Sequence, residues 1–463
     1  MRPEPSSATT SSSSRVDRRR FIGTAAVTGG VLGGLRMPAV HAAGSDEIRL
    51  ALVGCGGRGG GAAIDALEAP GGRVKLYAMA DVFPQRIEWL KKSLVEKYAD
   101  RIDVPEERCS VGFEAFKRAM DALRPGDIAL CATPPAFRAV HFAYAIEKGL
   151  HFFMEKPAAV DGPSAKRILE LAPRADAKNL KVAVGLMCRH CERRAELLER
   201  LRAGEAGDLI AFHGYREHPP IMSSDLAPGV PAGMTELQWQ TKRFHNFLWA
   251  SGGIFSDFCV HHIDEACWMK GAWPVLAEAV GGRHYQGKIN DQNFDSYAVD
   301  YTFADGAKFF YSCRTMSGTK TNFGVYGQGS KAAFKISGSG HSPARCAIYK
   351  SQRMDEDNVA WEAAQPEPSP YRREWEHLID AIVNDKPYNE AVRGAEASLV
   401  TAMGRFAAHV GQPVTYEQML DCPDDMTAGV AELTDQSPAP LQADAEGRYP
   451  VPMPGRYKFE YHK

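Results

Sequence analysis

The chain has 463 residues, of which 44% are hydrophobic and 24% are charged, a composition typical of a globular protein with large apolar cores. The formal net charge of −2 provides no overall attraction to nucleic acid or to an anionic membrane, so we expect no nucleic-acid partner. At roughly 150 residues per domain, the length indicates about two or three domains, and ten scattered cysteines do not indicate a disulfide scaffold.

The first segment, residues 1–45, differs in composition from the rest of the chain. Residues 1–14 are rich in Ser, Thr and Pro, which is typical of disorder. Residues 17–22 (DRRRFI), a short Gly-rich apolar run over 22–35 and small residues ending at Ala42 predict a cleavable signal peptide that resembles a twin-arginine export signal. The apolar run is shorter than the roughly 20 residues of a spanning helix, although an uncleaved membrane tether stays an alternative. We therefore expect export to the periplasm or beyond by the twin-arginine machinery, with no membrane contact after cleavage.

Residues 46–187 alternate between short apolar runs and helical periodicity. This rhythm is typical of a doubly wound parallel sheet, and it predicts an N-terminal Rossmann domain of the α/β class. The predicted strands are 47–54, 74–80, 127–132, 151–154 and 181–186, and the predicted helices are 62–67, 83–98, 113–123, 137–148 and 163–171.

Residues 188–420 show a different pattern, in which consecutive strands follow one another through tight turns. This pattern predicts an α+β domain with a mostly antiparallel open sheet. The predicted strands are 209–216, 275–283, 295–303, 307–313, 322–326 and 331–336, the predicted helices are 192–203, 371–384 and 392–410, and residues 219–239 are predicted to form a loop. Residues 421–463 contain few apolar runs and several prolines, so we expect them to wrap the surface as a C-terminal tail.

A glycine cluster at residues 54–59 (GCGGRG) satisfies the pattern G-x-G-x-x-G between the first predicted strand and the first predicted helix. In this setting the glycines allow a tight turn and the close approach of a pyrophosphate to the helix N-terminus. Asp81 ends the second predicted strand, where a carboxylate accepts hydrogen bonds from the adenosine ribose and repels a 2′-phosphate. The pattern predicts NAD as cofactor, whereas Arg58 keeps NADP open as the less favoured alternative.

Residues 155–157 (EKP) follow the fourth predicted strand, at the carboxyl edge where doubly wound sheets bind their ligands. Lys156 at this edge is placed to approach both a nicotinamide and a substrate hydroxyl. Pro157 fixes the turn and is a candidate for a cis peptide bond. A plain Lys-Pro surface turn is the competing interpretation.

Residues 252–264 (GGIFSDFCVHHID) are predicted to be helical, which places Asp257, His261 and Asp264 on one face. A carboxylate beside an imidazole favours a general base near neutral pH. Zinc binding and a purely structural role are the alternatives. We expect no metal, because hydride transfer to a nicotinamide needs no Lewis acid when a lysine is available.

Taken in their order along the chain, these motifs resemble the glucose–fructose oxidoreductase/inositol dehydrogenase/rhizopine catabolism (Gfo/Idh/MocA) family over roughly residues 46–420. Residues 133–141 (TPPAFRAVH), 386–390 (KPYNE) and 404–405 (GR) resemble further family segments. The resemblance implies that Lys156 contacts nicotinamide and substrate, that Asp257 binds or orients a substrate hydroxyl and that His261 is the base, with His262 as its ambiguous neighbour. The residues expected to contact the cofactor are Gly54, Gly56, Gly57, Arg58, Gly59, Asp81, Thr133, Pro134, His141, Glu155 and Lys156.

Two further segments give weaker expectations. Arg189 and His190 lie between Cys188 and Cys191 after the last predicted parallel strand, so they are candidate substrate contacts. A single C-x-x-C pair is poor evidence for zinc, and a disulfide between the two thiols stays possible after export. The aromatic residues of 239–249, with the neighbouring basic side chains, are candidates for lining a sugar site, although packing is as plausible.

The predicted function is hydride transfer between a nicotinamide and a secondary hydroxyl or carbonyl of a sugar or polyol. Because free NAD is scarce outside the cytoplasm, we expect the cofactor to be tightly bound and regenerated within each cycle. The resemblance implies a homo-oligomer. An NAD-dependent glycosidase that acts by transient oxidation and elimination is the alternative activity, although those enzymes tend to lack the lysine of E-K-P. A non-catalytic sugar-binding protein on the same fold is the alternative of another class.

Overall fold

The computed structural model of the chain describes residues 47–70, 73–220, 230–284 and 291–461. The predicted twin-arginine signal lies outside the described residues. Both sheets of the fold belong to one unit of the chain, residues 39–463.

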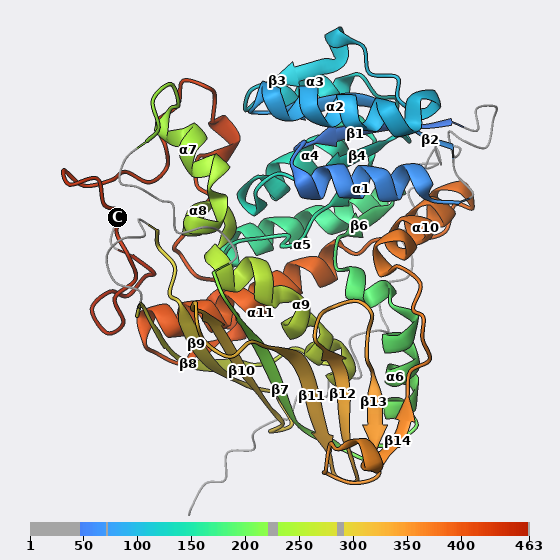
Figure 1. Cartoon of the computed structure of the whole chain (residues 1–463). Coiled ribbons are helices and arrows are strands. Elements are labelled where there is room, and N and C mark those ends of the chain that lie inside the picture. Colours follow the sequence, from blue (N-terminus) through green and yellow to red (C-terminus); the bar gives the residue numbers. More distant parts are fainter. Residues whose placement is uncertain (1–46, 71–72, 221–229, 285–290, 462–463) are drawn as a thin grey trace, which may run out of the picture. The chain divides into compact units, whose positions relative to one another are not determined.

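Within the described part of the chain, six parallel strands form the N-terminal sheet in the order β3-β2-β1-β4-β5-β6 (Figure 1). The strands are β1 (Glu47–Val53), β2 (Arg73–Asp81), β3 (Cys109–Val111), β4 (Ile128–Cys131), β5 (His151–Met154) and β6 (Val182–Val184). The strand order reverses between β1 and β4, which is the point where doubly wound sheets bind their ligands. The predicted Rossmann architecture is confirmed.

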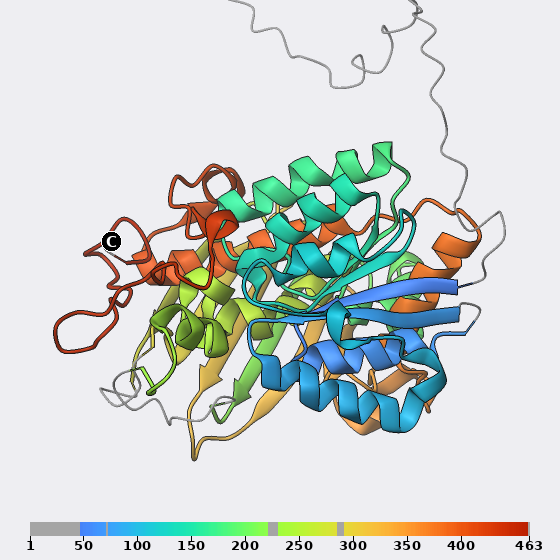
Figure 2. The same ribbon diagram turned by 90° about the horizontal axis from the view of Figure 1, so that it is seen from above.

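Helices cover both faces of this sheet (Figure 2). Alternate residues of β1 explain why: Leu50 and Leu52 pack into one core, and Ala51 and Val53 pack into the other. The helices α1 (Gly57–Glu68) and α2 (Pro84–Tyr98) cover the first face, and α3 (Ala115–Asp121), α4 (Arg138–Lys148) and α5 (Gly162–Ala177) cover the second.

A second sheet follows, and its nine strands, counted within the described residues, have the order β14-β13-β12-β11-β7-β10-β9-β8-β15. Neighbouring strands are antiparallel except for the pair β7 and β10, as the predicted mostly antiparallel sheet requires. The strands are β7 (Leu209–His218), β8 (Leu276–Gly282), β9 (Ser296–Thr302), β10 (Lys308–Thr315), β11 (Asn322–Gly329), β12 (Ala333–Gly338), β13 (Ala347–Tyr349), β14 (Val359–Glu362) and β15 (Val414–Thr415). The fold class is therefore confirmed.

The helices α9 (Gly253–Lys270) and α11 (Ala391–Val410) pack against one face of the second sheet. Tyr297, Val299 and Tyr301 of β9 point into this core, whereas the residues between them are partly or fully exposed. The alternation explains why the strands were predictable from the sequence, because one face is packed and the other is not. The remaining helices are α6 (Glu192–Arg202), α7 (Glu236–Lys242), α8 (Leu248–Ser251), α10 (Pro370–Val383) and α12 (Tyr416–Leu420).

The helix α10 packs on the N-terminal sheet, although the predicted boundaries assign it to the second domain. Trp375 stacks on Phe153 of β5, with ring centroids 4.4 Å apart and planes 6° from parallel. Glu390, just after this helix, accepts a hydrogen bond from the backbone of Val184 in β6 at 2.9 Å. The chain thus returns to complete the first core after building the second sheet.

The sequence prediction missed several short elements. Strands β3 and β13 have three residues each, too few for an alternating pattern to be visible. The predicted loop over 219–239 contains the start of α7, whose first turn is capped by Thr235 and Gln238 in a reciprocal capping box.

The C-terminal tail is more deeply buried than predicted. Tyr449 and Tyr461 join an apolar cluster with Phe247 and Trp249, and the Glu460 carboxylate is fully buried. The tail therefore contributes to the core as well as covering the surface.

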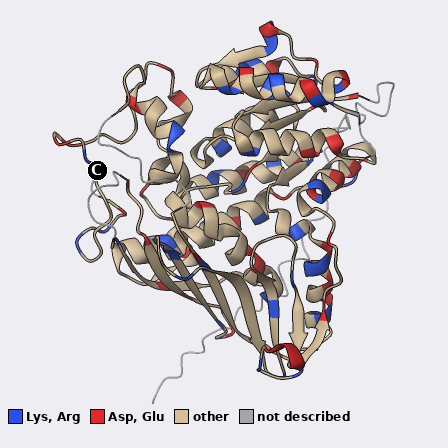
Figure 3. Cartoon of the chain, in the orientation of Figure 1, with Lys and Arg blue, Asp and Glu red and all other residues tan. Residues whose placement is uncertain are grey.

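Charges are mixed along the surface helices. Figure 3 shows basic and acidic residues alternating on α2 and α6. None of the described helices is long and apolar enough to cross a membrane.

Candidate active site

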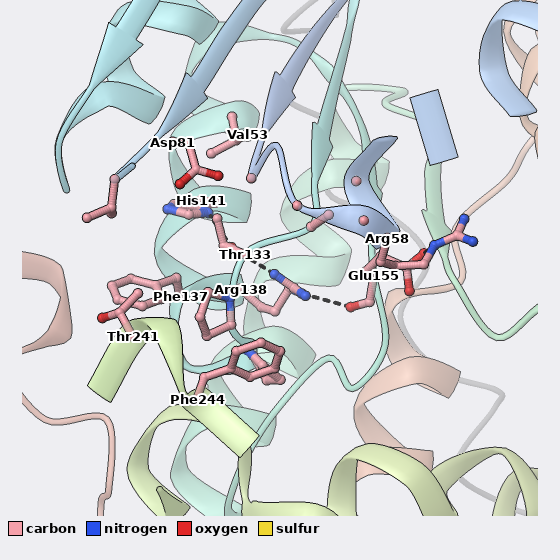
Figure 4. A pocket seen from close by; sticks show the side chains of 18 of the residues that line it. Val53, Arg58, Asp81, Thr133, Phe137, Arg138, His141, Glu155, Thr241 and Phe244 are labelled. Carbon is pink, nitrogen blue, oxygen red and sulfur yellow. Dashed lines mark hydrogen bonds and ion pairs between the residues drawn. The ribbon is translucent and has the colours of Figure 1, made fainter. Parts of the chain in front are cut away.

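A cavity of about 510 Å³ lies at the carboxyl end of the parallel sheet (Figure 4). One side is formed by the residues that follow β1, β2, β4 and β5, and the other side is formed by α9 and the short helix η7 (Phe244–Asn246). Every residue predicted to contact the cofactor lines this cavity, and so do Asp257 and His261. The tertiary structure thus brings together residues from Val53 to Tyr371.

The glycine loop has the geometry that the motif predicts. Gly54 has φ +96°, and a Cβ there would lie 2.8 Å from the backbone of Ala132. A Cβ on Gly59 would lie 1.9 Å from the Gly54 carbonyl oxygen, so only glycine allows the helix to pack this closely on the strand. Gly56, by contrast, precedes the first residue of α1 and has open space where a Cβ would be. Its role is to leave room for a ligand at the helix N-terminus.

Asp81 stands at the end of β2 and is nearly buried. Its carboxylate accepts hydrogen bonds from the backbone N–H of Cys55 at 2.7 Å and of Phe83 at 2.9 Å, so it also holds the glycine loop in place. Burial raises the pKa of Asp81. These backbone donors and Arg86 lower the pKa, but by less than burial raises it. The nearby cation is Arg86, 3.8 Å away, which sequence reasoning did not identify.

Arg58, the predicted aid to NADP, is directed elsewhere. Its guanidinium donates to the Glu155 carboxylate at 2.6 Å and lies 3.6 Å from Asp65. It also lies over the ring of Tyr371, 5.0 Å from the centroid. Arg58 therefore ties α1 to the turn after β5.

The segment after β4 is held by a buried arginine that was not predicted. Arg138 donates to the Thr133 hydroxyl at 2.8 Å and to the Glu155 carbonyl at 2.7 Å, so it links the turns after β4 and β5 (Figure 4). His141 lies 3.3 Å from the same hydroxyl and packs against Phe116. Burial, followed by the charge of Arg138, lowers the pKa of His141 to about 3. This histidine is neutral at physiological pH.

Lys156 reaches across the cavity to α9. Its Nζ donates to the backbone carbonyl of Asp257 at 2.6 Å and lies 3.4 Å from that carboxylate. The peptide bond between Lys156 and Pro157 is cis, as predicted. Lys156 therefore connects the carboxyl end of the parallel sheet to α9.

The carboxylate of Asp257 contacts His245, not His261. His245 Nε2 lies 2.9 Å from Asp257 Oδ2, and His245 stacks on Phe258. Burial raises the pKa of Asp257, but Lys156 and His245 together lower it by more than burial raises it, so the carboxylate stays ionised. The predicted pairing of Asp257 with His261 is corrected in this respect, because the two carboxylate oxygens face Lys156 and His245.

His261 lies on the cavity wall beside His341, with ring centroids 4.5 Å apart. Its Nδ1 is buried and has no hydrogen-bond partner among the described residues. Burial, followed by the charge of His341 and of Lys156, lowers its pKa well below the usual value. His261 is thus a neutral imidazole with a free nitrogen.

Four residues singled out in the sequence do not line the cavity. Arg189 forms a bidentate pair with Asp264 at 2.7 and 2.8 Å. Asp264 shares the helix face of Asp257 and His261, as predicted, but lies further along α9 and does not line the cavity. His190 is buried between His377 and Glu390, and His262 bonds the hydroxyl of Tyr311 at 3.1 Å. Arg189, His190 and His262 stay predicted substrate contacts, but their polar atoms bond to neighbouring elements and not to the cavity.

Cys188 and Cys191 are both free thiols in the structure. The predicted aromatic lining of the site is found only in part, since Phe244 and His245 line the cavity, whereas Trp239 and Trp249 pack in the protein core. Arg216 and His341 also line the cavity. These two were missed because they come from the second sheet and its loops, where the sequence carries no local motif.

The cavity fits a dinucleotide by its own geometry. Open space above Gly56, the uncapped N-terminus of α1 and the carboxylate of Asp81 lie along one wall, and the polar groups of Lys156 and His261 lie at the other end. Residues 48–185 match the family model of the Gfo/Idh/MocA oxidoreductases, described as their NAD-binding Rossmann fold. This segment is an NAD-binding Rossmann domain.

Curated relatives are similar to part of the chain. Inositol 2-dehydrogenase from Corynebacterium glutamicum is 27% identical over 169 residues, which are 36% of this chain and 42% of that protein. The chain therefore spans less than half the length of this relative in the match.

Solved structures resemble the fold beyond the NAD-binding domain. Aldose-aldose oxidoreductase from Caulobacter crescentus, complexed with glycerol, has a TM-score of 0.62 and 17% identity, and the match covers 80% of this chain and 99% of that one. Scyllo-inositol dehydrogenase from Lactobacillus casei, with bound NAD(H) and scyllo-inositol, has a TM-score of 0.58 and 19% identity, with the same coverage. At these identities, the similarity shows that this chain shares its fold, with both sheets, with these structures.

Proposed function

We propose that the protein is an NAD-dependent oxidoreductase that transfers hydride between the nicotinamide and a secondary hydroxyl or carbonyl of a sugar or polyol. The observation that carries the proposal is that Lys156, Asp257 and His261 share one cavity with the glycine loop of the NAD-binding domain. The similarity to inositol dehydrogenases supports the substrate class.

The protein groups have separable roles in this reaction. Bound NAD supplies the hydride acceptor. Lys156 places a positive charge where a substrate oxygen becomes an alkoxide, and its contact with Asp257 keeps the ammonium at that point. His261, whose imidazole lines the cavity, takes the hydroxyl proton.

His245 is a second candidate for the base. His245 lines the cavity, and its Nε2 lies 2.9 Å from the Asp257 carboxylate. A carboxylate beside an imidazole favours a general base.

Single variants distinguish these roles. We expect Lys156→Ala and His261→Asn each to lower kcat/KM by about 100-fold or more while NAD still binds. His245→Asn is expected to act through the position of Asp257 and to lower kcat/KM by about 10-fold. The matched control is Lys166→Ala, whose exposed ammonium pairs with Asp421 on the surface. A larger loss in His245→Asn than in His261→Asn would move the role of the base to His245.

The test of the function itself is a panel of sugars and polyols added to the protein with NAD. An absorbance increase at the reduced-nicotinamide band, absent in Lys156→Ala, is the expected result. Release of an aglycone from a glycoside with no net change in reduced cofactor would replace the proposal with the redox-assisted glycosidase. Unchanged sugar binding without any redox change in the presence of NAD would leave a sugar-binding protein.

NAD is proposed over NADP because of Asp81. A 2′-phosphate would lie against this buried carboxylate, and Arg86 at 3.8 Å is already engaged with it. We expect kcat/KM with NAD to exceed that with NADP by at least about 10-fold. Asp81→Ser should lower the ratio of kcat/KM with NAD to kcat/KM with NADP. Equal values of kcat/KM with the two cofactors in the unchanged protein would contradict the assignment.

We also propose export by the twin-arginine route with the cofactor already bound. The support is the sequence of residues 17–42, together with the scarcity of free NAD outside the cytoplasm. Mature protein recovered from the periplasm should begin near Ala43 and release nucleotide on denaturation. An unprocessed N-terminus, or purified protein that gains activity only on addition of NAD, would contradict this.

The uncovered face of the second sheet supports a homo-oligomer. Ile210, Val280 and Phe310 are 54%, 72% and 38% exposed, and Val280 and Phe310 lie on the strands β8 and β10. We propose that a second copy covers this face. Val280→Glu with Phe310→Glu should then reduce the mass measured by light scattering to that of one chain, whereas a monomer in the unchanged protein would overturn the proposal.

A further inference from the structure

Three side chains with metal-binding atoms converge just behind the cavity wall. They are Cys188 of the short helix η6 (Met187–His190), Glu265 of α9 and His341 between β12 and β13. Their ligand atoms all lie within 4.8 Å of one another. We propose that Cys188, Glu265 and His341 bind a divalent transition metal, with Zn²⁺ as the species that their chemistry favours.

The measured distances fit a single ion. A tetrahedral zinc with ordinary bond lengths places a thiolate sulfur about 3.6 Å from an imidazole nitrogen, and that nitrogen about 3.4 Å from a carboxylate oxygen. Cys188 Sγ lies 3.8 Å from His341 Nδ1, and that nitrogen lies 3.5 Å from Glu265 Oε1. Two of the three distances between ligand atoms are thus close to those around a tetrahedral ion, and the third, between Cys188 Sγ and the Glu265 carboxylate, is below 4.8 Å.

The carboxylate of Glu265 is the second observation that points to a ligand. It is 0% exposed, and neither oxygen accepts a hydrogen bond of ordinary geometry from the described residues. Its nearest cation is Arg194, whose Nη2 lies 3.2 Å from Oε1 but donates its hydrogen bond to the His341 carbonyl. A buried carboxylate is costly unless it is paired and hydrogen-bonded or coordinates a metal, and this one lacks the hydrogen bonds.

The charges are compatible with a dication. A thiolate and a carboxylate neutralise Zn²⁺, and Arg194 leaves the cluster with a single positive charge, which weakens binding without preventing it. Cys191, the other half of the C-x-x-C pair, is not part of the cluster, because its thiol donates to Glu367.

The site adjoins the cavity through His341. This residue uses Nδ1 toward Cys188 and Glu265, its ring lines the cavity, and its centroid is 4.5 Å from that of His261. Three protein ligands leave one position of a tetrahedral ion open, which is typical of catalytic rather than structural zinc. Metal binding at this site requires neither NAD nor substrate, so it can be measured on the protein alone.

The test uses the full-length protein, freed of metal with a chelator and titrated with Zn²⁺ and with Co²⁺. We expect about one ion per chain, and for Co²⁺ the near-ultraviolet band of a thiolate-to-cobalt charge transfer. Cys188→Ser should abolish that band, and Cys188→Ser and His341→Asn should each weaken Zn²⁺ binding by at least about 10-fold. Cys191→Ser, a buried thiol in the same segment, is the matched control and should bind metal as the unchanged protein does.

Folding of each variant is checked by its circular dichroism spectrum and its urea-unfolding midpoint. A folded protein that binds no Zn²⁺ and shows no cobalt–thiolate band overturns the proposal. An equal loss of Zn²⁺ binding in Cys191→Ser and in Cys188→Ser would also overturn the proposal. A protein that binds metal as expected but reduces no NAD with any sugar would leave the metal site standing and reject the proposed function.

Discussion

At the residue scale, glycines at different positions of the glycine loop have different roles. Gly59 is required by the fold, because a Cβ there would lie 1.9 Å from a carbonyl oxygen. Gly56 is not required by the fold, because nothing lies within 4 Å of the corresponding position. In this loop, Gly59 is therefore needed for folding, whereas Gly56 is expected to be needed for binding.

This separation predicts opposite results for two alanine variants. Gly59→Ala should lower the free energy of unfolding by more than about 2 kcal/mol, since backbone must move to admit the methyl group. Gly56→Ala should change that free energy by less than about 1 kcal/mol but raise the Kd for NAD by at least about 10-fold. Urea unfolding and a fluorescence titration measure the two effects. Equal destabilisation by both variants would contradict the interpretation.

The buried His141 predicts a dependence of stability on pH. Burial lowers its pKa in the folded protein to about 3, whereas the unfolded chain has a value of about 6.5. Between these values only the unfolded chain takes the proton, so the stability is fully present above about pH 6.5 and falls as the pH decreases. From pH 7 to pH 5 this one residue should remove about 2 kcal/mol.

The measurement is urea unfolding at pH 7 and pH 5 of the unchanged protein and of His141→Gln. The variant should lose about 2 kcal/mol less over this interval. His284→Gln is the control, because that side chain is 64% exposed. An identical pH response in all three proteins would show that the pKa of His141 is the same in the folded and the unfolded chain.

At the element scale, α9 shows how tertiary contacts select among the residues on one face of a helix. Asp257, His261 and Asp264 share that face, but only Asp257 and His261 line the cavity, whereas Asp264 pairs with Arg189 after β6. The helix is almost entirely buried, so its successive turns meet different neighbours. Helical spacing predicted the common face correctly, but it did not predict how far along the helix the cavity extends.

The C-terminal tail and α11 are joined by a buried ionic cluster. The guanidinium of Arg405 makes two hydrogen bonds to Glu460, at 2.6 and 2.7 Å, and His409 lies 2.7 Å from the same carboxylate. All three side chains are essentially inaccessible. Burial raises the pKa of Glu460, but Arg405 and His409 bring it down to about 2.

We therefore expect Glu460→Gln to lower the free energy of unfolding by about 3–5 kcal/mol, because it leaves the Arg405 charge buried without its partner. The matched control is Glu446→Gln, since Glu446 pairs with Arg448 on the surface with both side chains more than 60% exposed. That change should cost less than about 1 kcal/mol. Similar urea midpoints for the two variants would mean that the tail does not stabilise the fold.

At the scale of the whole molecule, the cavity joins both sheets. Residues after β1, β2, β4 and β5 face α9 and His341 across it, and the contact of Lys156 with Asp257 bridges them. A ligand that fills this space contacts both layers of one unit. Binding should therefore stabilise the whole unit and not the NAD-binding domain alone.

NAD at 100 times its Kd should add about 2.7 kcal/mol to the free energy of unfolding, in a single transition. Urea unfolding followed by tryptophan fluorescence measures it, because Trp375 lies in the first core and Trp268 packs against the second. Gly56→Ala at the same NAD concentration should show a smaller increase. Two separated transitions, with only one shifted by NAD, would contradict the coupling.

The sequence by itself determined the order of elements, the glycine loop and the residues at the strand ends. These features are local: burial on two faces gives continuous apolar strands, a parallel sheet places strand ends at one edge, and a positive φ needs glycine. For this reason Lys156, Asp81 and the cofactor segment could be identified from sequence pattern alone. The short strands β3 and β13 and the helix α7 could not, because three residues or one turn carry too little periodicity.

Only the tertiary structure decided which side chains meet. The pairing of Asp257 with Lys156 and His245, the return of α10 to the first sheet, the burial of Glu460 and the meeting of Cys188 with Glu265 and His341 all join residues far apart in the chain. Such contacts depend on how whole elements pack against one another. A periodic pattern states which face of an element is buried, but not which partner buries it.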